Sequence, residues 1–127
     1  MIKRETIDAF EKTQAQMEAL HREIAALSRK SPNDGVNIFK LGLINKVVHT
    51  TNQLLGETYR PFADFDSFDE NNLPTVSDVA MVLAQYLNCL EKYRADNVHV
   101  YQGYWCWCTG AGEDCIRTAQ PKKLEGK

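Results

Sequence analysis

The stretch Val98–Cys108, with the sequence VHVYQGYWCWC, decides the fold class of this 127-residue chain. Before it, apolar residues recur with the period of a helix. Within it, apolar and aromatic residues recur at every second position, which is the period of a strand. Gly103 interrupts the run and predicts a β-bulge. The sequence therefore predicts an α+β fold, predominantly α, with a three-helix bundle followed by a C-terminal β-hairpin over about residues 98–118.

The predicted strand has no polar face. Successive side chains in a strand point to opposite sides, so one side would carry Val98, Val100, Tyr104, Cys106 and Cys108, and the other His99, Tyr101, Trp105 and Trp107. A strand with one solvated face alternates apolar with polar residues, and this one does not. We therefore expect the helices to cover one face, and a partner protein, a second copy or a ligand to cover the other.

Three amphipathic helices are predicted at about residues 5–30, 37–55 and 77–96. In the first, Phe10, Met17 and Ile24 recur every seven residues. About three heptads is short for an independent coiled coil, so we expect the stripe to pack inside one bundle. The alternative is that part of it contacts a second chain. The length suits a single domain over residues 1–127.

Local signals set the helix ends. Pro32 and Gly35 break the chain after the first helix, and Gly56 is placed to end the second. Either Thr75 or Ser77 can cap the third helix. After the hairpin's turn at Gly110–Gly112 and return strand at Cys115–Thr118, residues 119–127 read as a frayed tail.

Three phenylalanines at a spacing of three lie between the second and third helices, interleaved with aspartates: Phe62, Phe65 and Phe68. We expect them to pin this loop onto the bundle. The alternative is an exposed hydrophobic and acidic segment that docks another protein.

The cysteine spacing raises the question of a metal. Cys106, Cys108 and Cys115, with His99, have the composition of a Cys₃His zinc site. Structural zinc usually uses Cys-x₂-Cys knuckles, whereas Cys-x-Cys in a strand is less suited to chelation. The sequence therefore predicts no metal and no cofactor, with a structural zinc module as an alternative.

The same cysteines could instead form a disulfide. With Ala111 and Gly112 as turn residues, Cys108 would lie opposite Cys115, whereas with a three-residue loop over Gly110–Gly112 Trp107 would lie there instead. Thiols in the cytoplasm are normally reduced, so we expect the cysteines mainly to fill space.

Several function classes find no support in the sequence. The histidines are scattered, and no nucleophile motif or phosphate-binding loop is present, so the chain is not expected to be an enzyme. The net charge of −2 makes nucleic acid an unlikely partner. With no signal peptide and no apolar run of about 18 residues, we expect a cytoplasmic protein without membrane contact.

The remaining candidate surface is aromatic and basic. It comprises Tyr101, Tyr104, Trp105, Trp107, Arg117, Lys122 and Lys123. Tyrosine and tryptophan are enriched at protein interfaces, so the leading expectation is a non-catalytic, oligomeric interaction module: an adaptor, inhibitor or accessory subunit. The alternative is a binder of a nucleotide or another small anionic ligand, which the rings would stack and the cations neutralise.

Overall fold

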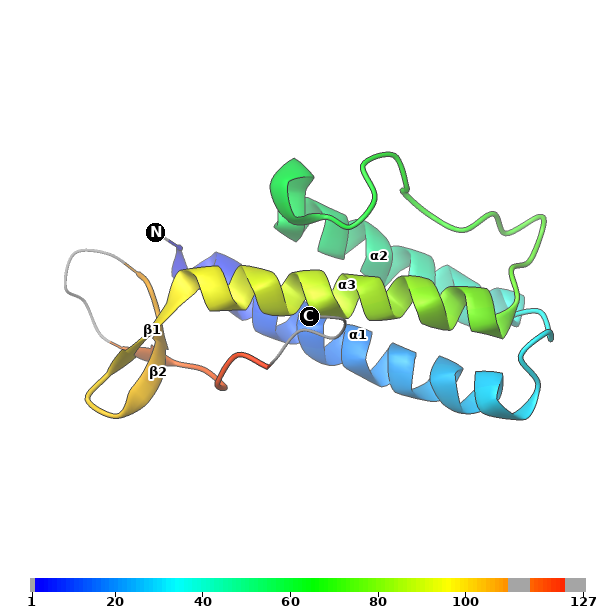
Figure 1. The fold of residues 1–127 in the computed structure, drawn as a ribbon. Helices are drawn as coiled ribbons and strands as arrows, with labels where there is room; N and C mark the ends of the chain where they lie inside the picture. The colour runs from blue at the N-terminus through cyan, green and yellow to red at the C-terminus, as the bar shows by residue number, and fades with distance from the viewer. Residues whose placement is uncertain (1, 110–114, 123–127) are drawn as a thin grey trace.

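The computed structural model describes residues 2–109 and 115–122 and confirms the predicted fold class. In these residues the chain forms helices α1 (Arg4–Lys30), α2 (Ile38–Tyr59) and α3 (Val76–Asn97), then strands β1 (Val98–Tyr101), β2 (Tyr104–Trp107) and β3 (Ile116–Arg117). Figure 1 shows the three helices side by side, with the small sheet at the end of the bundle where α3 ends and α1 begins.

The seven-residue stripe of α1 forms part of the bundle core. Phe10, Met17 and Ile24 are almost completely buried, as are Leu83 and Tyr86 of α3. The helix α1 packs more extensively on α3 than on α2. Because the stripe already faces the other two helices, its apolar surface is used inside the molecule.

The helix ends follow the local signals closely. The Thr75 hydroxyl accepts a hydrogen bond from the backbone N–H of Asp78, at 3.2 Å, and so caps α3. Gly56 interrupts α2 in the left-handed region, at a φ of +64°. One further turn reaches Tyr59, so the helix is broken at the predicted residue but extends past it.

Two of the three phenylalanines that were predicted to pin the loop pack against the bundle. Phe65 and Phe68 are half-buried against the core, and Phe62 is exposed. The side chains of Asn45 and Asn52 on α2 donate hydrogen bonds to the carbonyls of Phe68 and Phe65, at 3.0 and 3.1 Å. The loop backbone therefore finds its partners on a helix, which fixes its path.

Candidate functional site: the C-terminal sheet and its seat on the bundle

A two-residue turn joins β1 to β2. Gln102 and Gly103 have φ values of +51° and +84°, the left-handed pair that the type I′ hairpin turn requires. Tyr101 therefore pairs with Tyr104, and His99 pairs with Cys106. The predicted bulge at Gly103 is wrong, because the glycine serves instead to reverse the chain.

This reversal changes which residues share a face. Paired residues of two antiparallel strands point the same way, so Val98 and Val100 join Trp107 and Trp105 on one face. We call this the inner face. The outer face carries His99, Tyr101, Tyr104, Cys106 and Arg117. The predicted faces of Val98–Tyr101 were wrong because they treated Val98–Cys108 as one continuous strand.

The return strand completes a sheet of order β1-β2-β3, with β2 in the centre. Cys106 pairs with Arg117, and Trp107 pairs with Ile116. Beyond the ladder, the Thr118 N–H donates to the Trp105 carbonyl at 3.0 Å. The predicted turn at Gly110–Gly112 lies outside the described residues.

Trp107 anchors the inner face of the sheet in the core. It is 1% exposed, and its ring meets that of Phe10 edge-on, with centroids 5.1 Å apart. Its indole N–H donates to Oε2 of Glu11 at 3.1 Å. Because this ring is committed to the core, it leaves almost no surface for a ligand or a partner.

The outer face is partly covered from within the chain. The guanidinium of Arg117 lies 3.5 Å from the centroid of the Tyr104 ring, a cation–π arrangement. Cys106 is 1% exposed and is bonded to Cys115. Tyr101 and Tyr104 remain about half exposed, at 52% and 48%, so open aromatic surface is confined to the turn end of the hairpin.

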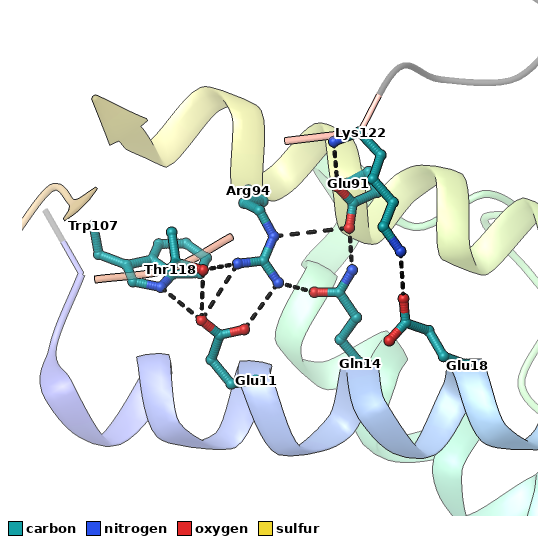
Figure 2. A network of polar contacts seen from close by, with 8 residues as sticks. All are labelled: Glu11, Gln14, Glu18, Glu91, Arg94, Trp107, Thr118 and Lys122. Atoms are coloured by element: carbon teal, nitrogen blue, oxygen red, sulfur yellow. Dashed lines mark hydrogen bonds and ion pairs between the residues drawn. The ribbon is translucent and has the colours of Figure 1, made fainter. Parts of the chain in front are cut away.

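Beneath the sheet lies a largely buried polar group of residues that the sequence did not reveal. We call it the Arg94 cluster, and it consists of Glu11, Gln14, Glu91, Arg94 and Thr118. Figure 2 shows the Arg94 guanidinium between side chains of α1, the segment after β3 and its own helix. It donates to both Glu11 oxygens, at 2.9 and 3.3 Å, and to Gln14 and Thr118. Only 4% of Arg94 is exposed.

Glu11 collects the donors of this cluster. Its Oε2 accepts from the Thr118 hydroxyl at 2.6 Å, and it also accepts from Trp107 and Arg94. Burial desolvates the carboxylate and acts to raise its pKa, but the hydrogen bonds from Thr118, Arg94 and Trp107 outweigh burial and leave the pKa lowered. Glu11 is therefore a carboxylate that joins α1 to the sheet.

Lys122 adds further contacts between the segment after β3 and the helices. Its backbone N–H donates to Oε1 of Glu91, and its ammonium pairs with Oε2 of Glu18, both at 2.8 Å. The hydrogen bond and ion pair with Glu18 raise the pKa of Lys122. Lys122 thus lies along α1 and α3, apart from Arg117 on the outer face, and Lys123 lies outside the described residues. Of the predicted aromatic and basic residues that the structure describes, Arg117 lies over Tyr104, whereas Trp107 is in the core and Lys122 pairs with Glu18, so these do not form one platform.

The cysteines also differ from expectation. Cys106 and Cys115 form a disulfide, with Cα atoms 5.2 Å apart. The sequence favoured reduced cysteines and offered Cys108 as the possible partner of Cys115. The thiol of Cys108 is free, and its sulfur lies 3.2 Å from Nδ1 of His99. In the described residues, no group of three potential ligands is arranged to hold a metal ion.

One sequence signal could have revealed Arg94. The apolar stripe of α3 runs through Leu83, Tyr86 and Leu90, and Arg94 continues it one turn later. A cation on the buried side of a helix requires an acidic partner. Glu11 follows the buried Phe10 on α1. An acidic residue therefore adjoins the apolar stripe of α1, as Arg94 adjoins that of α3.

A groove lies elsewhere, between α1 and α2. It has a volume of about 590 Å³ and is lined by apolar residues, Leu20, Leu43 and Val47 among them, and by polar ones such as Gln16 and Thr50. Glu23 and Lys40 at its rim form an ion pair at 2.8 Å.

No family model matches the chain, and no match to a curated protein or a solved structure was found. Among the described helices, none combines the length and the apolar character needed to cross a membrane.

Proposed function

We propose that this chain is a non-catalytic protein-interaction module that self-associates through the outer edge of β1. The observation that supports this most strongly is the composition of that edge. Natural edge strands are kept short, bulged or covered, or are protected by lysine, proline or inward-pointing charge. The strand β1, with the sequence VHVY, is short but carries no lysine, proline or inward-pointing charge, and Val100 and Tyr101 are 57% and 52% exposed.

The alternation of hydrogen-bonded and non-hydrogen-bonded pairs in the hairpin identifies the backbone groups of β1 that have no partner on β2. In a hairpin closed by a two-residue turn, the residues that flank the turn form a hydrogen-bonded pair, and every second pair follows. Tyr101 and His99 therefore direct their backbone groups toward β2. The Cys108 N–H, which donates to the Asn97 carbonyl at 2.8 Å, fits this phase. The N–H and C=O groups of Val98 and Val100 then point away from the sheet.

A second copy of the chain is the partner that this edge fits best. If two β1 strands meet antiparallel about a twofold axis at His99, Val98 of each copy lies opposite Val100 of the other. The outward groups of these residues then satisfy one another, as an isologous interface requires. The exposed Val100 side chain would meet an apolar partner residue in place of water.

The firm attachment of the sheet to the helices supports self-association. A recognition surface costs less entropy to bind when it is already rigid. Trp107 in the core and the Arg94 cluster fix the inner face of the sheet on the helices. The edge of β1 therefore belongs to a rigid part of the molecule. The edge is short, which predicts a modest affinity.

Light scattering across a range from micromolar to hundreds of micromolar tests the proposal. We expect the mass to rise from that of one chain toward that of two. Val100→Lys, which places a charge on the edge, should hold the mass at one chain. Met81→Lys is the matched control, because Met81 is similarly exposed, at 60%, but lies on α3.

Two results would count against the proposal. One is a native mass equal to one chain at every concentration. The other is association that survives Val100→Lys but is abolished by Phe39→Lys, since Phe39, 72% exposed at the start of α2, is the most exposed large apolar residue described. That result would place the interface on the helices.

A further inference from the structure

The outer face of the sheet brings three cysteines and a histidine together, and this grouping does not depend on self-association. We propose that Cys106, Cys108 and Cys115 form an internal thiol–disulfide exchange site, in which Cys115 bonds alternately to Cys106 and to Cys108, and His99 carries the proton. The structure holds one of the two states, with Cys106 bonded to Cys115 and Cys108 free.

The strand register supports the second state. Cys106 pairs with Arg117 and Trp107 with Ile116, so extending the same ladder by one pair sets Cys108 opposite Cys115. The Thr118 N–H to Trp105 carbonyl bond makes Trp105 and Thr118 a hydrogen-bonded pair, so the extended pair is a non-hydrogen-bonded one. Such pairs have Cα atoms about 4.5 Å apart, within the range of about 4.4–6.8 Å that disulfides span.

The two states therefore differ by a small shift of Cys115 along β2. In the observed state, Cys115 lies diagonally beside Cys106, with Cα atoms 5.2 Å apart. In the alternative state, it would sit directly across from Cys108, two residues along the same face of the strand. Cys115 can therefore reach either sulfur without any change in the pairing of β1 with β2.

His99 is placed to serve both sulfurs. Its Nδ1 lies 3.2 Å from Sγ of Cys108, and its backbone register partner on β2 is Cys106. The ring is exposed and Cys108 is half-buried, so the thiol is within reach of solvent and adjacent to a base. A nucleophile beside a base is the arrangement that activates a thiol.

The exchange balances without any external oxidant or reductant. The Cys108 thiol gives its proton to Nδ1 of His99, and the thiolate sulfur attacks Sγ of Cys115. The Cys108–Cys115 bond forms as the Cys106–Cys115 bond breaks, and the electron pair of the broken bond stays on the Cys106 sulfur. The imidazolium then protonates that sulfur, so one disulfide and one thiol are present before and after.

Differential alkylation of the native protein tests the exchange directly. Free thiols are capped with iodoacetamide, the protein is reduced, and the remaining thiols are capped with N-ethylmaleimide. Trypsin leaves Cys106, Cys108 and Cys115 in one peptide and separates Cys89 from them, so fragment-ion masses assign each cap. We expect the first cap on both Cys106 and Cys108, each in part, and none on Cys115.

Either of two labelling results would overturn the proposal. A first cap on Cys108 alone would mean that the disulfide is fixed. A first cap on all three cysteines would mean that the native protein holds no disulfide to exchange.

Two variants test the parts of the site. Cys106→Ser should still form a disulfide, now between Cys108 and Cys115, seen as the loss of two hydrogens in the intact mass. Two reactive thiols at Cys108 and Cys115 would contradict the second state. His99→Gln should slow the alkylation of Cys108 at neutral pH, because the thiol then lacks the neighbouring ring nitrogen that takes its proton. His49→Gln on α2 is the control, and equal rates in the two histidine variants would remove His99 from the reaction.

Discussion

Nη2 of Arg94 lies 2.9 Å from Oε1 of Glu11, and this ion pair joins α3 to α1 directly beneath the C-terminal sheet. The pair is asymmetric, because the arginine side chain is 4% exposed and the glutamate 39%. Without its partners, the buried arginine would therefore carry a larger desolvation cost than the more exposed glutamate. Its two Nη groups also bind Thr118 and Gln14, and its Nε lies 3.7 Å from Oε2 of Glu91. One residue therefore connects two helices and the segment that follows β3.

Arg94→Met should destabilise the fold by about 3–5 kcal/mol, because it removes the cation 3.7 Å from the buried Glu91 carboxylate. Urea denaturation, followed by helical circular dichroism, measures the free energy of unfolding. Lys92→Met on the same helix is the control. Lys92 pairs with Asp96 at 3.0 Å in the open, and such pairs contribute at most about 1 kcal/mol. Equal losses in the two variants would show that the Arg94 cluster does not hold the fold.

The lowered pKa of Glu11 predicts a loss of stability in acid. A carboxyl whose pKa is lower in the folded state stabilises the fold above its unfolded value of about 4.5, and this contribution disappears as the pH falls through the lower folded value. The native protein should therefore exceed Glu11→Gln in unfolding free energy at neutral pH, and the difference should shrink below about pH 4.5. A difference that is constant with pH would contradict the assigned role of the carboxylate.

The two tryptophans should report different surroundings. Trp105→Phe leaves only the buried Trp107, whose emission should be blue-shifted and resistant to acrylamide. Trp107→Phe leaves the half-buried Trp105, which should be quenched more readily. Trp107→Phe should also cost about 1–3 kcal/mol, since the Glu11 carboxylate loses an indole donor. Equal quenching of the two single-tryptophan proteins would place Trp107 outside the core.

A double-mutant cycle tests how the phenylalanine loop is held. The Tyr86 hydroxyl donates to Oδ1 of Asn52 at 2.8 Å, and Asn52 in turn donates to the Phe65 carbonyl. Asn52→Leu should cost about 1–3 kcal/mol, because it leaves the buried hydroxyl unpaired. Adding Tyr86→Phe should recover part of that loss. Strictly additive effects in thermal denaturation would show that the two side chains are not coupled.

The sequence was sufficient for the helices because their signals are local. The stripe of Phe10, Met17 and Ile24, the cap at Thr75 and the break at Gly56 each act within a few residues. The turn at Gln102 was missed for a local reason as well. Glutamine rarely adopts a positive φ, and the usual hairpin signal is Asn-Gly or Asp-Gly. The strand pattern was recognised, but the point of reversal was not.

The Arg94 cluster could not be assembled from local patterns. A charged residue on a helix is ordinarily solvated, and the burial of Arg94 depends on Glu11, 83 residues earlier, and Thr118, 24 residues later. Likewise, the pairing of Cys115 with Cys106 depends on where the return strand lies. These contacts are set by tertiary packing, and only the structure brings them together.

Backbone hydrogen exchange at Val98 and Val100 tests the central claim most directly. Self-association through β1 predicts that both amides exchange rapidly in dilute protein and become protected at hundreds of micromolar, while the His99 and Tyr101 amides are protected throughout by β2. Val100→Lys should abolish the concentration dependence at Val98. If the Val98 and Val100 amides exchange equally fast at both concentrations, the edge of β1 is not the interface.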